Sequence, residues 1–296
     1  MRHVNLKGMG IALITPFQTN GEVDYPALSR LIDFQLQNGT DYLVVLGTTA
    51  ETPTLTASEQ KDITRFVIDK VKKRIPVVLG CISGNNTKAV TERLKTENLE
   101  GVDAILSVVP YYNKPSQEGI YQHYKAIAQA ASLPLVLYNV PGRTGVNMTA
   151  ETTLRLAHDF ENVVAVKEAS GNIQQISKII KYKPDRFDVI SGDDSVTFPL
   201  ITSGAIGIIS VLGNAFPKEF SRMVHLALAG DYAGALKLHY QFMEMYELLF
   251  VDGSPAGVKS ALKILGYIEN ELRLPLVPVR DTTYENIRNA IKELHF

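Results

Sequence analysis

The sequence has 296 residues, of which 45% are hydrophobic and 21% charged, a balance that supports a globular core and excludes a disordered chain. Its 30 lysines and arginines nearly cancel its 31 aspartates and glutamates, so the chain lacks the basic excess typical of nucleic-acid-binding proteins. The single cysteine, Cys81, excludes an internal disulfide and a zinc site built from several cysteines.

The sequence contains no apolar stretch of about 18 residues, the length that a membrane-spanning helix requires. Residues 1–5 also lack the apolar core of a signal peptide. We therefore expect a soluble, cytoplasmic protein that has neither a membrane nor a nucleic acid as its partner.

Eight short apolar runs recur along the first 210 residues. Each run is rich in β-branched side chains and apolar throughout, which is typical of a strand buried on both faces of a parallel sheet. The predicted strands cover residues 10–14, 42–46, 76–79, 104–109, 134–138, 163–166, 187–190 and 206–210.

Amphipathic stretches separate these runs, and we expect them to form helices. Leu28, Leu31 and Ile32 recur at helical spacing. Thr56 stands three residues before Glu59, as in a capping box that begins a helix. Strands that alternate with helices favour a parallel α/β architecture. Eight such units favour a closed (β/α)8 TIM barrel, with a doubly wound sheet as the alternative.

The pattern changes after the eighth predicted strand, because no further strand is evident. Residues 231–250 predict one long helix, and two more helices are expected over 256–265 and 281–294. We therefore expect a catalytic barrel over residues 1–230 and a C-terminal α-helical domain over residues 231–296.

Lys167 is the most informative polar residue, because it directly follows the apolar run 163–166. The active site of a (β/α)8 barrel lies at the carboxyl ends of its strands. Burial there disfavours the charged form of a lysine, and a neutral amine is the nucleophile that forms a Schiff base with a ketone. The alternative is a lysine that reaches solvent or pairs with Glu168 or Asp193.

Four hydroxyl side chains, those of Thr48, Thr49, Tyr112 and Tyr138, are also expected at strand ends. Hydroxyls both donate and accept protons, so a phenol beside a nascent imine can transfer them. The alternative is that these residues cap the core and form tight turns. Arg143, in a loop after the fifth strand, suits a carboxylate held by two hydrogen bonds, or is a surface arginine.

A metal site is not expected. Asp193 and Asp194 follow the seventh strand, where a helix N-cap is favoured over a magnesium site built from carboxylates alone. No glycine-rich nucleotide-binding loop is present, and Cys81 is expected to be a small buried residue. The histidines all fall outside the predicted strand ends, at His3, His123, His158, His225, His239 and His295.

Five segments at the predicted strand ends form a distinctive set: Gly47–Glu51, Pro110–Pro115, Tyr138–Gly145, Lys167–Ala169 and Ser191–Asp194. With these segments the chain resembles the dihydrodipicolinate synthase family of pyruvate-dependent class I aldolases. The third segment, YNVPGRTG, is the most specific of the five, whereas the first is shared more widely among related aldolases.

The resemblance implies a Schiff-base-forming lyase that condenses pyruvate with L-aspartate 4-semialdehyde, in diaminopimelate and lysine biosynthesis, without a cofactor. Lys167 would form the Schiff base with pyruvate, and Tyr138 would be the central proton donor and acceptor. Thr48 and Tyr112 would complete a proton relay to solvent.

The resemblance also implies how the substrates are held. Thr49 and the backbone of Ile209 would bind the pyruvate carboxylate near the Gly192 carbonyl, and Arg143 would bind the carboxylate of the semialdehyde. Tyr112 would enter the site of a neighbouring subunit, which implies a homo-oligomer: a tight dimer, in a tetramer that is a dimer of dimers.

Some members of the family carry a lysine-feedback site, and this chain departs from it. Tyr111 is present, but Ala57 and Gln60 stand where histidines are expected. Lys88 or Ala89 stands where an acidic residue is expected. We therefore expect weak or absent inhibition by lysine.

Two alternatives remain from the sequence. The first is another pyruvate-dependent aldolase, such as an N-acetylneuraminate lyase or a keto-deoxy sugar acid aldolase, although Arg143 favours a small second substrate with its own carboxylate. The second is a catalytically silent barrel that only binds a keto acid, which the complete set of reactive side chains disfavours. Ala50, in place of a common glycine, changes the loop without removing a functional group.

Overall fold

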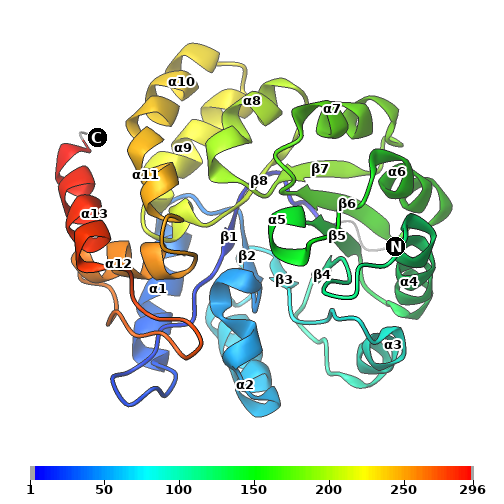
Figure 1. Cartoon of the computed structure of the whole chain (residues 1–296), viewed down its shortest axis with the longest axis horizontal. Coiled ribbons are helices and arrows are strands. Elements are labelled where there is room, and N and C mark those ends of the chain that lie inside the picture. Colours follow the sequence, from blue (N-terminus) through cyan, green and yellow to red (C-terminus); the bar gives the residue numbers. More distant parts are fainter. Residues whose placement is uncertain (1–3, 295–296) are drawn as a thin grey trace.

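The computed structural model describes residues 4–294, in which eight parallel strands form a closed barrel (Figure 1). The last strand pairs with the first, with Gly10 beside Ile209, and this pairing closes the ring. The predicted (β/α)8 barrel is confirmed, and each strand boundary lies within two residues of its predicted position. The strands are β1 (Gly8–Ala12), β2 (Tyr42–Val45), β3 (Val77–Leu79), β4 (Ala104–Val108), β5 (Leu135–Asn139), β6 (Val163–Glu168), β7 (Asp188–Ser191) and β8 (Gly207–Ser210).

Helices surround the barrel and cover its outer face (Figure 1). The predicted capping box is confirmed, since Thr56 and Glu59 form it completely at the start of the second helix. The helices up to the end of the barrel are α1 (Tyr25–Gln37), α2 (Ala57–Val71), α3 (Thr87–Thr96), α4 (Gln117–Ala130), α6 (Ala150–Asp159), α7 (Ile173–Tyr182), α8 (Thr197–Thr202) and α9 (Pro217–Leu228).

Short helical turns lie in the loops that follow the strands, at the end of the barrel where the site is expected. They are α5 (Pro141–Thr144) and the 3-10 helices η1 (Thr48–Ala50), η2 (Thr52–Thr54), η3 (Asp194–Val196) and η4 (Leu212–Asn214). None of the helices in the described part of the chain has both the length and the apolar character needed to cross a membrane.

Strand side chains alternate between two apolar clusters, which explains why each strand is apolar throughout. Val45 and Val166 belong to the outer cluster, between strands and helices, whereas Val44 and Ala165 belong to the inner cluster, which fills the barrel. Lys167 lies two residues after Ala165 in β6, so its side chain points into the barrel.

The chain beyond β8 is helical throughout its described part. After α9 come α10 (Tyr232–Gln241), α11 (Met243–Leu248), α12 (Ala256–Ile264) and α13 (Asp281–Glu293). The two helices predicted over 256–265 and 281–294 are therefore confirmed. In Figure 1 these elements lie on the side of the barrel where α1 is found, with α13 at the edge of the molecule.

The prediction of one helix over residues 231–250 is wrong, because the helix is interrupted at Phe242. This residue has φ −97° and ψ 5°, outside the helical region. Its ring is fully buried, with its centroid 5.6 Å from that of Phe216 and 5.8 Å from that of Phe220. Burial of this large ring against α9 favours a bend over the straight helix that the local pattern predicts.

Candidate active site

A cavity of about 520 Å³ opens at the carboxyl ends of the strands. Loops after β2 to β5 and the end of β6 contribute to its lining. The sequence-predicted residues Thr48, Tyr138, Arg143 and Lys167 all line this cavity. The structure therefore brings together four side chains that lie up to 119 positions apart in the sequence (167 minus 48).

Lys167 is held at the centre of this group by the register of the strands. It pairs with Tyr138 of β5 on one side and with Ile190 of β7 on the other. Only 6% of Lys167 is exposed, and its Nζ lies 4.3 Å from the centroid of the Tyr138 ring. No carboxylate forms an ion pair with Lys167 within residues 4–294, so its amine is available for chemistry.

The structural pairings that the sequence left open for Lys167 are not formed, because both carboxylates have other partners. Glu168 is buried and accepts hydrogen bonds from Asn139 Nδ2 at 2.7 Å and Gln175 Nε2 at 3.0 Å. Asp193 accepts from the backbone N–H of Ser195 at 2.9 Å. Glu168 instead joins the ends of β5 and β6 to α7, and thereby fixes the strand that carries Lys167.

Thr48 and Thr49 occupy η1, the turn that follows β2. Thr48 is exposed to the cavity, whereas Thr49 is buried and lies outside the cavity lining. The turn is defined by the backbone, since Glu51 adopts a left-handed conformation with φ 56° and donates its N–H to the Thr48 carbonyl. The methyl group of Ala50 is buried in this turn, which therefore accommodates the departure from glycine.

The predicted pyruvate-binding residues Gly192 and Ile209 lie close to the inner cluster. A Cβ atom at Gly192 would stand 3.0 Å from Lys167 Cε, so a side chain there would displace the lysine. Ile209 is buried in β8 and belongs to the inner cluster together with Tyr138. Neither residue is part of the cavity lining itself, but Gly192 sets the space in which Lys167 lies.

Arg143 lies on α5, directly after β5. The helix begins at Pro141 and ends at Thr144, and Gly145 caps it with a φ of 69°, which suits glycine. Arg143 is exposed at the cavity and forms no ion pair among the described residues. Its guanidinium is therefore free to bind a carboxylate through two parallel hydrogen bonds.

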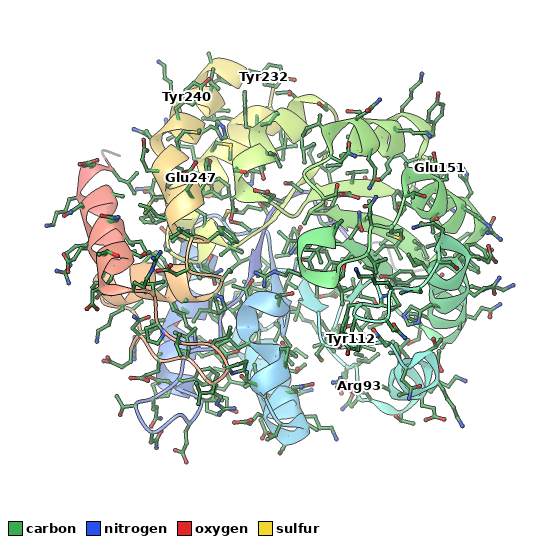
Figure 2. The ribbon with its side chains drawn as sticks, viewed as in Figure 1. Arg93, Tyr112, Glu151, Tyr232, Tyr240 and Glu247 are labelled. Atoms are coloured by element: carbon green, nitrogen blue, oxygen red, sulfur yellow. The ribbon has the colours of Figure 1, made fainter. Side chains whose placement is uncertain are left out.

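Tyr112 does not join the other predicted residues within one chain. It is 89% exposed, has φ 62° and lies outside the cavity, whose lining includes its neighbour Tyr111 instead. Asn85 holds this loop by accepting from Tyr111 N at 2.9 Å. Figure 2 shows Tyr112 on the side of the barrel where Arg93 of α3 lies.

The two aspartates after β7 differ from each other, and the N-cap prediction is correct only for Asp193, which caps η3. Asp194 is buried and accepts from Ser210 Oγ at 2.5 Å and from the N–H groups of Val211 and Leu212. Burial raises the pKa of Asp194 to about 6. This aspartate joins the loops after β7 and β8, a role that no local sequence pattern indicates.

The remaining reactive side chains lie apart from Lys167 or are inert. Burial raises the pKa of the Cys81 thiol to about 11, so it stays protonated at neutral pH. No group of three acidic, histidine or cysteine side chains that could hold a metal occurs between residues 4 and 294. His3 and His295 lie outside the described residues, and the others lie on helices, at His123, His158, His225 and His239.

Comparison with known proteins gives one consistent result. The model of the dihydrodipicolinate synthetase family matches residues 5–294. The 4-hydroxy-tetrahydrodipicolinate synthase of Parabacteroides distasonis is 69% identical, over 99% of each chain. The solved dihydrodipicolinate synthase of Thermotoga maritima superimposes with a TM-score of 0.94 at 42% identity, covering 97% of this chain and 98% of its own. A monomeric dihydrodipicolinate synthase variant also gives a TM-score of 0.94 at 42% identity, covering 97% and 96%.

Proposed function

The chain belongs to the dihydrodipicolinate synthetase family, and from this premise we propose how its residues carry out the reaction. That reaction is the condensation of pyruvate with L-aspartate 4-semialdehyde by a Schiff-base-forming lyase, in the diaminopimelate and lysine pathway. The observation that supports the residue assignment most strongly is Lys167, which is buried beside Tyr138 in the cavity and is without a carboxylate partner in the described chain.

In the proposed mechanism, the neutral amine of Lys167 attacks the C2 carbonyl of pyruvate, and loss of water gives the imine. Loss of a proton from the methyl carbon then gives an enamine, whose carbon attacks the aldehyde of the second substrate. The amino group of that substrate attacks the former imine carbon, and Lys167 leaves as the ring closes. The Tyr138 hydroxyl donates and accepts the protons, with Thr48 and Tyr112 completing the relay to solvent.

The proposed binding groups divide between the two substrates. Thr49 and the backbone of Ile209 hold the pyruvate carboxylate, close to the Gly192 carbonyl. Arg143 binds the carboxylate of the semialdehyde, which its free guanidinium at the cavity supports. The semialdehyde would thus approach from the side of α5, while pyruvate lies between Lys167 and the loops after β7 and β8.

We also propose that the chain assembles as a tight homodimer within a tetramer, with Tyr112 entering the neighbouring site. The support is the position of Tyr112, which is almost fully exposed on a left-handed residue of a loop that Asn85 holds in place. We further propose that the protein is cytoplasmic. We also propose that it divides into a barrel over residues 1–230 and a helical domain over residues 231–296. The division is supported by the end of β8 at Ser210.

The test is chemical trapping of the imine. The protein is incubated with pyruvate and borohydride, digested, and analysed by peptide mass mapping. We expect one reduced pyruvate adduct, on the peptide that contains Lys167, and none in the Lys167→Ala variant. A wild-type protein without an adduct on Lys167 would refute the assignment. A coupled assay with aspartate semialdehyde and with a sugar aldehyde identifies the acceptor, and turnover of the sugar aldehyde alone would favour the alternative aldolases.

A further inference from the structure

A second buried lysine lies near the barrel mouth, but not in the cavity. The Nζ of Lys259 in α12 lies 2.5 Å from Oε1 of Glu51, and both side chains are 0% exposed. Lys259 is absent from the cavity lining, and its ammonium group is engaged by Glu51. The pair therefore needs an explanation other than catalysis.

Glu51 ends the turn that carries Thr49, which is proposed to bind pyruvate, and Thr48, which is proposed to relay protons. Its N–H donates to the Thr48 carbonyl, and its left-handed backbone joins η1 to η2. The hydroxyl of Thr52 donates to the Gly47 carbonyl at 2.8 Å and closes the same turn. These hydrogen bonds tie Glu51 and Thr52 to the carbonyls of Thr48 and Gly47, so Glu51 is part of the same compact turn as Thr48 and Thr49.

The C-terminal segment engages both oxygens of this carboxylate. Lys259 contacts Oε1, and the backbone N–H of Arg273 donates to Oε2 at 3.1 Å. Lys259 Nζ is itself held by the Glu271 carbonyl at 2.9 Å and lies 4.2 Å from the centroid of the Phe17 ring. Phe17 lies beyond β1, so this single ammonium group joins the loops after β1 and β2 to the C-terminal helices.

Stability alone does not account for a charged pair at this place. A fully buried ion pair pays a large desolvation penalty, and apolar residues of similar volume often serve the fold equally well. A charged contact does, however, fix the direction and position of its partner, which an apolar contact does not. Burial lowers the pKa of Lys259 to about 8, which leaves its ammonium group mostly protonated at neutral pH.

We propose that Lys259 is a positioning residue, which acts through Glu51 to hold the Thr48–Thr49 turn in the orientation that binds pyruvate. This inference rests on the proposed function, because it uses the assignment of pyruvate to that turn. It also assigns a role in the reaction to the C-terminal helices, since α12 carries the charged residue that positions a loop of the barrel.

The test uses the variants Lys259→Met and Glu51→Gln, which remove one charge each with little change of shape, and the double variant that carries both. The matched control is Lys263→Met, because Lys263 lies one turn further along α12 and pairs on the surface with Glu269. For each protein we measure the KM for pyruvate, the KM for aspartate semialdehyde, and kcat. The kcat is calculated per active site, and active sites are counted by labelling with pyruvate and borohydride. Thermal unfolding of each variant is recorded in parallel.

We expect each single variant to raise the KM for pyruvate about tenfold while the KM for the semialdehyde changes less than about twofold. The double variant should show no more than the effect of one single variant, because the two residues act through each other. The control should equal the wild type.

An unchanged KM for pyruvate in the folded variants overturns the proposal. This holds even if their thermal stability falls, because the pair would then have a structural role only. Multiplicative effects in the double variant overturn it too. If one single variant does not fold, the proposal is tested with the other single variant and with the double variant, in which both charges are removed. The same change in the KM for pyruvate is the criterion. Failure of the proposed function is a separate result, since the wild-type enzyme would then lack the pyruvate adduct on Lys167.

Discussion

Two lysines are buried in the described chain, and their surroundings separate their tasks. Lys259 meets a carboxylate and stays a charged structural contact, whereas Lys167 faces a tyrosine ring and a cavity. The Glu51 carboxylate occupies the amine of Lys259, whereas the amine of Lys167 has no carboxylate partner among the described residues. The difference between these two residues is the physical basis for assigning the Schiff base to Lys167.

At Tyr138, the substitution Tyr138→Phe retains the ring beside Lys167 and removes only the hydroxyl. We expect kcat to fall about 10²–10⁴-fold, the usual contribution of a positioned acid or base. Thermal stability should change little, because the ring still fills the inner cluster. Steady-state kinetics and a melting curve measure both.

Tyr124→Phe is the matched control for this experiment. Tyr124 is also a buried tyrosine, but its hydroxyl donates to the Ser107 carbonyl at 2.7 Å and lies outside the cavity lining. Its loss should leave kcat unchanged. Activity of Tyr138→Phe within a few-fold of the wild type would remove Tyr138 from the proton relay.

The start of α2 is stabilised by a carboxylate with several partners. Glu59 completes the capping box with Thr56 and pairs with Arg273 from the C-terminal segment. The hydrogen bond from Arg273 is the main cause that lowers the pKa of Glu59 to about 2. A lowered folded-state pKa means that this contribution to stability is present above the unfolded pKa of about 4.3 and is lost as the pH falls towards 2.

We therefore expect Glu59→Gln to lower the free energy of unfolding at pH 7 by about 1 kcal/mol, the upper range for a partly exposed pair. The difference from the wild type should shrink steadily between about pH 5 and pH 2. Denaturant unfolding of both proteins across this pH range measures the difference in the free energy of unfolding. Glu244→Gln, at an exposed residue of α11, is the control, and a difference that grows towards low pH would contradict the pairing.

Helices α2 and α3 also contribute to the cavity, with two residues near the positions where the sequence departs from the family's feedback site. Arg93 and Gln60 line the cavity together with Tyr111. Arg93 pairs with Glu97, and its Nη2 donates to Gln60 Oε1 at 3.3 Å. This part of the lining thus carries a cation, and Glu97, the carboxylate beside it, is already paired.

We accordingly expect lysine to inhibit weakly or not at all. An activity assay over a range of lysine concentrations, at fixed pyruvate and semialdehyde, tests this. Potassium chloride at equal ionic strength is the control for screening. Inhibition at low lysine concentration would show that the cationic environment of Arg93 does not decide binding.

At the scale of the whole molecule, the proposed site depends on which subunit supplies Tyr112. Tyr112 is exposed and absent from the cavity of its own chain. A mixture of Tyr112→Phe and Lys167→Ala proteins tests whether it is shared between subunits. In a hybrid dimer with shared tyrosines, one site contains both wild-type residues and the other contains neither.

We expect the mixture, after subunit exchange, to recover roughly a quarter of the wild-type activity, since half of the dimers are hybrids with one competent site. Each variant mixed with itself is the control. Mixtures that exchange subunits, as shown by mass spectrometry, but stay inactive would place Tyr112 outside the neighbouring site. Sedimentation measures the oligomeric state of the same samples.

Local patterns predicted much of this structure because the signals they use are local. The strands were identifiable from their continuous apolar runs, since a strand covered on both faces needs apolar residues at every position. The capping box at Thr56 depends only on residues three apart. The break at Phe242 could not be predicted this way, because it depends on two distant rings, Phe216 just before α9 and Phe220 within it, that pack against that residue.

The sequence by itself determined the barrel, the place of the site at its carboxyl ends, and the residues that the family motifs mark. Only the tertiary structure decided that Glu168 and Asp194 are occupied by other partners, that Tyr112 faces outwards, and that Lys259 reaches Glu51. The reason is physical. Periodicity and capping report contacts between near neighbours, whereas a buried charge chooses its partner from all residues that folding brings within a few ångströms.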